Sequence, residues 1–323
     1  MDNTPMSRRR LIGGMLVTPA ATVLLNACGG ESTSTGSTAT TGATSTSAAT
    51  GTSTTGAVPA TAAWASGGTD PITVDYPATS IFANASTCEL SLTPAETEGP
   101  CYFQSDTGED IPEGRTGLPM QLAVQLVDTG CAPLEGYTIE VWHCDTAGIY
   151  SGDTSDSDDA ARFAGSFCTA DDAEAVESTW FRGQLTTDAD GRVNFKTCFP
   201  GWYAGRTIHI HFAVTDPDGT TRVISQWCFP DEFTEEICTT HDLYADRGAQ
   251  DTPLGGGTDT VFPADDYDVY LLDLEQNSDG TLLGYGVIQI DPTAVATESG
   301  SGGGGTPPGG GNGAPPASPD QDT

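Results

Sequence analysis

The sequence predicts an all-β fold, a β-sandwich of mainly antiparallel strands with a few short helices and long loops. Two observations predict it. Short segments in which apolar and polar residues alternate recur through the middle of the chain, as expected when successive side chains point to opposite faces of a strand. Turn segments rich in Gly, Asp and Pro separate them. Many short strands joined by such turns are typical of a sandwich.

The first expected strands show the alternation most clearly. In Met120–Leu126, four large apolar residues alternate with Gln, Ala and Gln, and Tyr137–Val141 follows the same pattern. The turn Asp188–Gly191 then joins Leu185–Thr187 to Val193–Phe199. Because an Asp- and Gly-containing turn between two alternating segments is a hairpin signal, we expect these two segments to pair with each other.

The second half of the domain continues this pattern, again with Asp-Gly turns between the strands. Four further strands are expected, at Thr207–Thr215, Arg222–Phe229, Asp268–Leu274 and Leu282–Ile290. Helix signals are few and short, and they lie at Asp171–Val176 and Asp231–Thr239. The spacing of these elements fits one all-β domain.

Both ends of the chain are expected to lie outside this domain, which we place at residues 80–295. Residues 28–75 consist mainly of Ser, Thr, Gly and Ala, and residues 296–323 are rich in Gly and Pro. Such segments cannot bury enough apolar surface to fold. They therefore predict a flexible tether and a disordered tail.

Residues 1–27 predict an export signal of the twin-arginine type. Ser7–Gly13 contains three consecutive arginines, and the apolar stretch that follows is too short to span a membrane comfortably. Leu25–Cys28 resembles a lipobox, which predicts acylation of Cys28; cleavage without acylation is the alternative, since Asn26 is unusual in that motif. We therefore expect an exported protein, periplasmic or at the cell surface, anchored to the membrane as a lipoprotein.

The cysteines agree with export. Apart from Cys28, eight cysteines lie within the expected domain, and an even number in an exported domain predicts disulfide bonds. No Cys-x-x-Cys pair is present in the sequence, which argues against a cysteine metal site. The sequence leaves the pairing open among Cys88, Cys101, Cys131, Cys144, Cys168, Cys198, Cys228 and Cys238.

The charge balance excludes one class of partner. The chain has 45 acidic and 11 basic residues, a formal net charge of −34. Such a surface repels nucleic acid and anionic lipid head groups, so no nucleic-acid partner is expected. The sequence does not show whether the acidic surface does more than keep the protein soluble.

Candidate metal ligands gather in the segment Pro200–His211. His209 and His211 are two residues apart, so on a strand both imidazoles leave the same face, about 6–7 Å apart at Cα. The apolar residues between and beside them point the other way, toward a core. Two imidazoles this close can share one metal ion, and imidazole suits iron, copper and zinc.

Two tyrosines narrow the choice of metal. Tyr203 lies in the same segment as the histidines, and Tyr150 lies upstream. A phenol with a pKa of about 10 ligates a metal only when a strongly acidic cation removes its proton. Two tyrosines beside two histidines therefore favour ferric iron, and copper bound by the histidine pair is the alternative.

Four segments of the sequence resemble the intradiol ring-cleavage dioxygenases. They are Thr97–Pro100, Val141–Gly152, Phe181–Gln184 and Pro200–Phe212. That family has a sandwich fold and uses non-haem Fe(III) and O₂ to open catechols between the two hydroxylated carbons. The resemblance implies a catechol-type substrate and a cis,cis-muconate-type product, with no external reductant.

The resemblance also implies roles for single residues. Tyr203 would release the metal and take up a substrate proton, Arg206 would stabilise charge on the substrate ring, and Gln226 would hydrogen-bond near the substrate. An ordinary surface ion pair is the alternative for Arg206. Cys228 stands where the family often has Tyr, so a disulfide could tie that pocket edge. The implied iron ligands are Tyr150, Tyr203, His209 and His211.

Other features have plainer interpretations. We expect a structural role for His143, with a hydrogen bond to a residue of the metal site as the alternative, and a surface position for His241. The acidic run Asp153–Asp159 lacks the Gly and Glu of an EF-hand loop and predicts a solvated loop. The short spacing between Tyr203 and Arg206 favours an open site suited to bulky catechols.

The competing function is a non-catalytic cell-surface module that binds aromatic or polysaccharide material. The particular catechol and the oligomeric state stay open.

Overall fold

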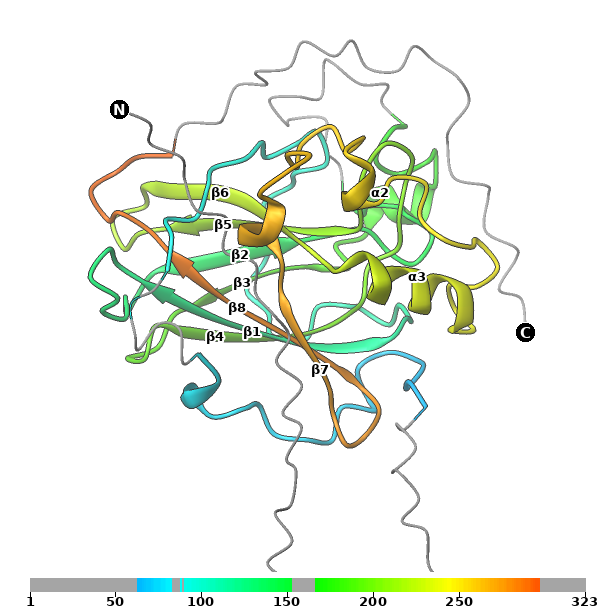
Figure 1. The fold of residues 1–323 in the computed structure, drawn as a ribbon, viewed down its shortest axis with the longest axis horizontal. Coiled ribbons are helices and arrows are strands. Elements are labelled where there is room, and N and C mark those ends of the chain that lie inside the picture. Colours follow the sequence, from blue (N-terminus) through cyan, green and yellow to red (C-terminus); the bar gives the residue numbers. More distant parts are fainter. Residues whose placement is uncertain (1–62, 83–87, 89, 153–165, 297–323) are drawn as a thin grey trace, which may run out of the picture. The chain divides into compact units, whose positions relative to one another are not determined.

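The computed structural model describes residues 63–82, 88, 90–152 and 166–296 (Figure 1). Several predictions from the sequence lie outside these residues. They are the export signal at residues 1–27, the acylation of Cys28, the tether as far as residue 62, the loop at residues 153–159 and the tail from residue 297.

Among the described residues, eight strands form two four-stranded sheets, which confirms the predicted all-β sandwich. The first sheet has the order β4-β1-β8-β7, and its members are β1 (Pro119–Val127), β4 (Arg192–Cys198), β7 (Asp273–Gln276) and β8 (Leu282–Gln289). The second has the order β3-β2-β5-β6, with β2 (Thr138–Trp142), β3 (Arg182–Thr186), β5 (His209–Thr215) and β6 (Thr221–Cys228). The β1–β8 pair is parallel and the other pairs are antiparallel.

Alternate residues of both sheets build the main core. Leu122 and Val124 of β1 and Ile210 and Phe212 of β5 are all inaccessible to solvent in one cluster, and Phe212 stacks on Trp227 of β6 with ring centroids 4.0 Å apart. Because side chains alternate along a strand, this arrangement leaves His209 and His211 together on the opposite face of β5.

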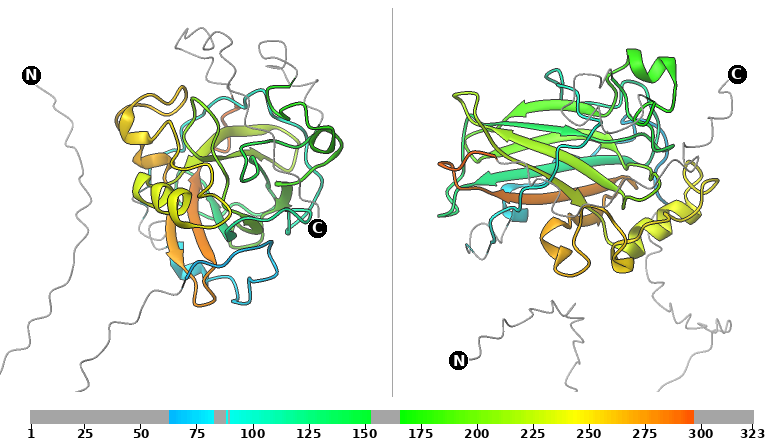
Figure 2. Two further views of the ribbon diagram at one scale, coloured as in Figure 1. Left: turned by 90° about the vertical axis from the view of Figure 1, so that its right-hand side faces the viewer. Right: turned by 90° about the horizontal axis from the view of Figure 1, so that it is seen from above.

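The helices are short and lie at the same end of the strands (Figures 1 and 2). Register brings the last residue of β2, Trp142, and Gln226 of β6 opposite His211 of β5. Three strands therefore deliver side chains to the end where the long loops gather. The helices are α2 (Ala173–Glu177) and α3 (Asp231–Thr240), and the 3-10 turns are η1 (Thr79–Phe82), η4 (Leu254–Gly256) and η5 (Tyr267–Tyr270).

The predicted tether ends earlier than residue 75. Trp64 packs edge-to-face on Phe233 of α3, and Gly67 exchanges backbone hydrogen bonds with Gly117. Val74 accepts a hydrogen bond at its carbonyl oxygen from the side chain of Gln121, 3.0 Å away. Residues 63–75 thus belong to the folded domain, because one tryptophan and their own backbone groups find partners that composition does not reveal.

The predicted hairpin between Leu185–Thr187 and Val193–Phe199 is wrong. β3 pairs with β2 and β4 pairs with β1, so the turn at Asp188–Gly191 crosses from one sheet to the other. The turn itself forms as expected, with Asp188 Oδ1 accepting from the backbone N–H of Arg192 at 2.8 Å. A turn signal is local, whereas the choice of strand partner depends on which faces bury apolar side chains.

One predicted strand is also shorter than expected. The segment Asp268–Leu274 begins within the 3-10 turn η5, and β7 covers only its last two residues before continuing to Gln276. The buried Tyr270 and Leu272 of this segment instead pack into two different apolar clusters.

No helix among the described residues has the length and hydrophobicity needed to span a bilayer.

Only half of the eight domain cysteines form disulfides. The bonds are Cys88–Cys131 and Cys101–Cys168. The other four are buried free thiols, and each lies in a different apolar cluster. They behave as small apolar residues. The disulfide considered for Cys228 is therefore absent. The four free thiols are Cys144, Cys198, Cys228 and Cys238.

Candidate metal centre

Tyr150 is carried by a tight loop that follows β2. The carboxylate of Asp145 closes this loop by accepting hydrogen bonds from the backbone N–H groups of Ala147 and Ile149, both at 2.9 Å. Gly148 has φ +82°, a conformation that favours glycine. The backbone N–H of Tyr150 then donates to the carbonyl oxygen of Cys168 at 2.8 Å. The phenol is consequently buried, with 2% of the residue exposed.

Tyr203 comes from the neighbouring loop between β4 and β5. Its carbonyl oxygen accepts from the backbone N–H of Arg206, which closes a turn around Ala204 and Gly205. The preceding Trp202 is anchored by its indole N–H, which donates to the carbonyl oxygen of Gly248 at 3.0 Å. The rings of Tyr150 and Tyr203 meet edge-to-face with centroids 5.9 Å apart.

The two histidines extend from β5 toward these phenols. Nδ1 of His209 lies 2.6 Å from the carbonyl oxygen of Thr207; since a carbonyl can only accept, Nδ1 carries the proton and Nε2 presents a lone pair. His211 stacks on Trp142 with centroids 5.0 Å apart and an interplanar angle of 11°. Both rings are therefore held in fixed orientations.

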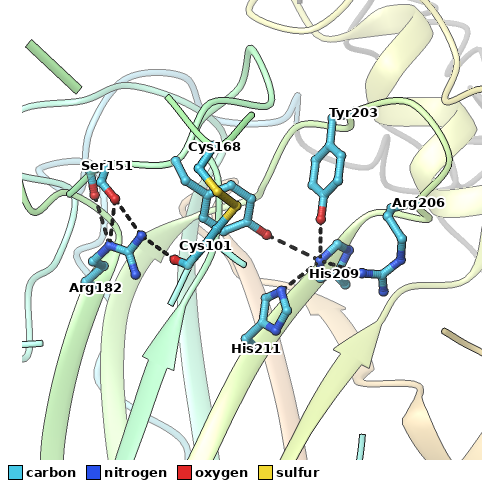
Figure 3. Close-up of a disulfide and its surroundings, with 9 residues drawn as sticks. Cys101, Ser151, Cys168, Arg182, Tyr203, Arg206, His209 and His211 are labelled. Carbon is cyan, nitrogen blue, oxygen red and sulfur yellow. Dashed lines mark hydrogen bonds between the residues drawn. A yellow bond between two sulfur atoms is a disulfide. The ribbon is translucent and has the colours of Figure 1, made fainter. Parts of the chain in front are cut away.

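Three potential ligand atoms surround a fourth, Nε2 of His209 (Figure 3). The hydroxyl of Tyr150 lies 3.3 Å from this atom, the hydroxyl of Tyr203 lies 3.2 Å away, and Nε2 of His211 lies 3.0 Å away. The fold thus brings together all four residues that the sequence predicted as ligands. They come from two loops and one strand that lie up to 61 positions apart in the chain.

Burial sets the protonation states of this group. It lowers the pKa of His209 to about 3 and holds that of His211 well below its usual value, so both imidazoles are neutral at ordinary pH. Burial also raises the pKa of Tyr203 to about 12 and that of Tyr150 well above 10. The phenols therefore keep their protons unless a strongly acidic cation displaces them.

The donor set fits a ferric ion better than a hydrogen-bond network. Nε2 of His209 has one lone pair, yet two hydroxyl donors and a second imidazole nitrogen lie within 3.3 Å of it. Nδ1 of His211 is buried without a hydrogen-bond partner among the described residues. No three His, Cys, Asp or Glu side chains form a metal site in the described part of the chain, so a metal here would depend on the phenols.

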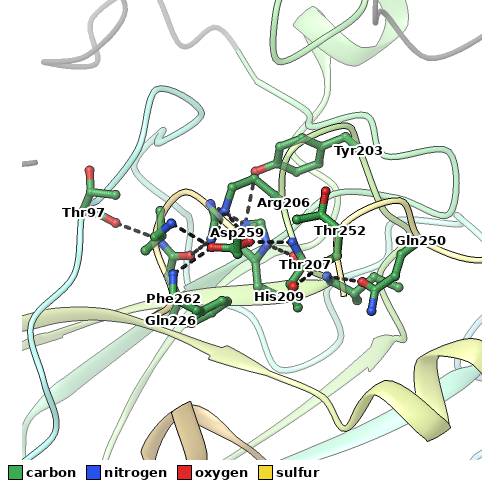
Figure 4. Close-up of polar contacts among 12 residues, drawn as sticks. Thr97, Tyr203, Arg206, Thr207, His209, Gln226, Gln250, Thr252, Asp259 and Phe262 are labelled. Atoms are coloured by element: carbon green, nitrogen blue, oxygen red, sulfur yellow. Dashed lines mark hydrogen bonds and ion pairs between the residues drawn. The ribbon is translucent and has the colours of Figure 1, made fainter. Parts of the chain in front are cut away.

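Arg206 reaches the same point from the side. One guanidinium nitrogen lies 3.5 Å from Nε2 of His209, and another donates to Oε1 of Gln226 at 2.6 Å (Figure 4). The amide nitrogen of Gln226 donates in turn to the carbonyl oxygen of Thr97 at 2.9 Å. Arg206 is buried, which rules out the ordinary surface ion pair considered from the sequence.

Asp259 is a member of this group that sequence reasoning missed. Its carboxylate accepts from Nε of Arg206 at 3.1 Å and from the backbone N–H groups of Thr207, Val261 and Phe262 at 2.6, 2.8 and 2.7 Å. Burial opposes both charges. The interaction nevertheless keeps the pKa of Asp259 below its usual value and that of Arg206 above its own. No local motif marks this aspartate within an acidic chain.

The remaining histidines have structural contacts. His143 is buried between the carbonyl oxygen of Cys144 and Oγ1 of Thr197, at 2.8 and 2.7 Å, which agrees with the structural role expected for it. The surface position expected for His241 is wrong, since 6% of this residue is exposed and its Nε2 lies 3.0 Å from the carbonyl oxygen of Ala65. Ala65 belongs to residues 63–75, the part of the predicted tether that is folded.

Comparison with known proteins finds similarity to dioxygenases. A family model described as Dioxygenase matches residues 97–242, a stretch that contains the four candidate ligands, Arg206 and Gln226 but ends before Asp259. The β chain of protocatechuate 3,4-dioxygenase from Burkholderia cepacia is 29% identical over 115 residues, which are 33% of this chain and 42% of that protein. The match therefore spans less than half the length of that curated relative.

Solved structures show the same fold. An intradiol ring-cleavage dioxygenase from Tetranychus urticae is 25% identical, with a TM-score of 0.51, and the match covers 66% of this chain and 98% of that one. A second solved dioxygenase is 26% identical with a TM-score of 0.53 and the same coverage. These comparisons confirm the resemblance to the intradiol ring-cleavage dioxygenase family.

Proposed function

We propose that the protein is a non-haem Fe(III) intradiol dioxygenase that cleaves a catechol-type ring with O₂ to a cis,cis-muconate-type product. The observation that carries this proposal is the convergence of two phenol oxygens and two neutral imidazole nitrogens at one buried point. A module that only binds aromatic or polysaccharide material would have no need for this donor set.

In this proposal the four donors would hold the iron, which when bound makes a chelated catechol reactive toward O₂. Tyr203 is the better candidate to exchange a proton with the substrate. Its ring is only partly buried, and the positive charge of Arg206 counteracts the effect of burial on its pKa, whereas Tyr150 is fully enclosed. The phenolate oxygen of Tyr203, which would have lost its proton on metal binding, would accept the proton of the second catechol hydroxyl.

Arg206 supports the same reaction electrostatically. Its guanidinium is held by Gln226 and Asp259 beside the convergent donors, so a fixed positive charge faces the position where a substrate ring would develop negative charge. Donors that are already oriented stabilise such charge without reorganising during the reaction. Gln226, anchored to Thr97, keeps the guanidinium from turning away.

The test is a visible absorption spectrum of the iron-loaded protein before and after anaerobic addition of catechol. We expect a tyrosinate-to-iron charge-transfer band that changes to a catecholate band, followed under ¹⁸O₂ by a ring-opened product carrying both labelled atoms. Tyr150→Phe should remove or shift the first band, whereas Tyr285→Phe, which removes a partly buried phenol on β8 that donates to Glu275, should not. A colourless protein despite bound iron would favour the binding module.

We also propose that the protein is exported and acylated at Cys28. The consecutive arginines at residues 8–10 and the lipobox-like Leu25–Cys28 support this. In a bacterial host with twin-arginine export, the full chain should appear in the membrane fraction, and Cys28→Ser should release it. Equal cytoplasmic retention of the full chain and of a variant with lysines at residues 8–10 would contradict export.

A further inference from the structure

Arg182 is buried beside the backbone that carries Tyr150. It is the first residue of β3, and 5% of it is exposed. Its Nε donates to the carbonyl oxygen of Ser151 at 3.0 Å, and one terminal nitrogen donates to the same oxygen at 2.5 Å and to the carbonyl oxygen of Cys101 at 2.7 Å (Figure 3). One guanidinium thus links the backbone next to Tyr150 to the segment that carries Cys101.

The Cys101–Cys168 disulfide links the Cys101 segment covalently to a third segment, which is hydrogen-bonded to Tyr150. Cys101 is linked to Cys168, and the carbonyl oxygen of Cys168 accepts the backbone N–H of Tyr150 at 2.8 Å. The links form a closed ring that passes from Arg182 to Cys101, across the disulfide to Cys168, through Tyr150 to Ser151 and back to Arg182. Tyr150 packs in one apolar cluster with both cysteines.

Burying the charged side chain of Arg182 costs free energy, which indicates that Arg182 does more than fill space in the core. A guanidinium stays charged at neutral pH even when it is buried. Within the described ranges no carboxylate forms an ion pair with Arg182, and its remaining terminal nitrogen is buried without a hydrogen-bond partner. Burying a charge destabilises the fold unless hydrogen bonds and electrostatic contacts offset the loss of hydration. The hydrogen bonds of Arg182 are concentrated on the backbone around Tyr150.

We propose that Arg182 and the Cys101–Cys168 disulfide form a clamp that positions Tyr150 for metal binding. Arg182 is a positioning residue in this clamp, because its guanidinium donates to carbonyl oxygens of the neighbouring backbone and lies over the Tyr150 ring, 6.0 Å from the centroid, rather than hydrogen-bonding to the phenol oxygen. Metal binding by Tyr150 rests on the proposed function. The contacts that hold Tyr150 in the clamp do not depend on that function, and they are tested separately.

The first test measures amide hydrogen exchange of the metal-free full chain by mass spectrometry. In Arg182→Met and in the Cys101→Ser/Cys168→Ser double variant, peptides covering residues 145–152 should exchange about tenfold faster, the effect of weakening one or two hydrogen bonds. Peptides from β1 should be unchanged. Arg182→Lys keeps the charge but has no planar fork for two carbonyls, and it should give a smaller change in the same direction.

The chain provides matched controls for both variants. Arg192→Met removes another largely buried arginine, on β4 of the other sheet. Cys88→Ser/Cys131→Ser removes the other disulfide, where Cys131 contacts the side chain of Gln289 rather than the candidate ligands. Neither control should alter exchange in residues 145–152. Faster exchange throughout the chain would mean general destabilisation, and unchanged exchange in residues 145–152 would mean no clamp; either outcome overturns the proposal.

The second test measures Fe(III) binding by metal analysis and by the visible spectrum. Loss of the clamp should weaken iron binding about 10- to 100-fold, as is usual for residues that orient a metal ligand, with no such loss in the two controls. If the wild-type protein binds no iron, the proposed function fails while the exchange result still decides whether the clamp exists. Unchanged iron affinity in a variant with faster local exchange would overturn the link between clamp and metal.

Discussion

Arg206 and Asp259 form an enclosed ion pair, with Nε and Oδ2 3.1 Å apart and side-chain exposures of 10% and 2%. The pair joins the loop before β5 to the loop before η5, 53 positions further along the chain. Three backbone N–H groups also donate to the carboxylate, two from the Asp259 loop itself and one from Thr207 next to Arg206. A segment outside the family match therefore helps to hold Arg206 beside the candidate ligands.

Replacing Asp259 should be costly. Asp259→Asn keeps the shape but leaves the Arg206 guanidinium buried without its anion, so we expect a loss of about 3–5 kcal/mol in unfolding free energy. Urea denaturation of the metal-free protein measures it. Glu174→Gln, which breaks the exposed contact with Arg115, is the control and should cost about 0–1 kcal/mol. Similar losses in both variants would contradict a special role for the enclosed pair.

Gly148 should be intolerant of substitution because it separates the two tyrosine loops. A Cβ at this position would lie 2.3 Å from the carbonyl oxygen of Trp202, and φ is +82°. Gly148→Ala should lose about 1–2 kcal/mol from the left-handed backbone alone, and more as Tyr150 and Tyr203 move apart, with weaker iron binding. Thermal unfolding and metal analysis measure the two effects.

Gly219→Ala is the matched control for this substitution. Its φ is +83°, but nothing lies within 4 Å of the added Cβ. It should therefore show the backbone cost without loss of iron. If both variants kept full iron affinity, the close approach of the two loops would not matter for the site.

Acid should destabilise the metal-free protein through His143. Burial lowers the pKa of His143 to about 4 from an ordinary value of 6.5. Between these values the unfolded chain binds a proton that the folded protein excludes, so stability falls as pH falls. From pH 7 to pH 5 this histidine should account for about 2 kcal/mol. Urea midpoints across this range should change less in His143→Gln, and an equal slope in both proteins would exclude His143 as the cause.

The cysteine chemistry gives a direct count. A Cys28→Ser chain, oxidised and then denatured, should show four reactive thiols, namely those at residues 144, 198, 228 and 238. In the native protein these thiols should react very slowly because they are buried, and burial raises the pKa of Cys198 to about 12. A thiol-reactive dye measures the number of thiols after denaturation and their reaction rate in the native protein. Absence of thiols after denaturation would show that all eight cysteines are paired.

Local pattern was enough for most of the secondary structure. Alternation in Met120–Leu126 predicted β1 to within a residue or two, and the two-residue spacing of His209 and His211 correctly placed both rings on one face of β5. The strand partners, in contrast, depend on contacts between distant segments. The turn after β3 looks like a hairpin turn but connects the two sheets, because each strand buries its apolar face beside a different neighbour.

The sequence by itself determined the sandwich class and the side chains with the chemistry for a ferric site, since strand period and donor type are properties of single residues and short spacings. The tertiary structure decided what no spacing encodes: that Asp259 holds Arg206, that Arg182 and one disulfide enclose Tyr150, and that four cysteines stay free. These depend on which segments meet in space, and such meetings follow from burial of the whole chain rather than from local conformational preference.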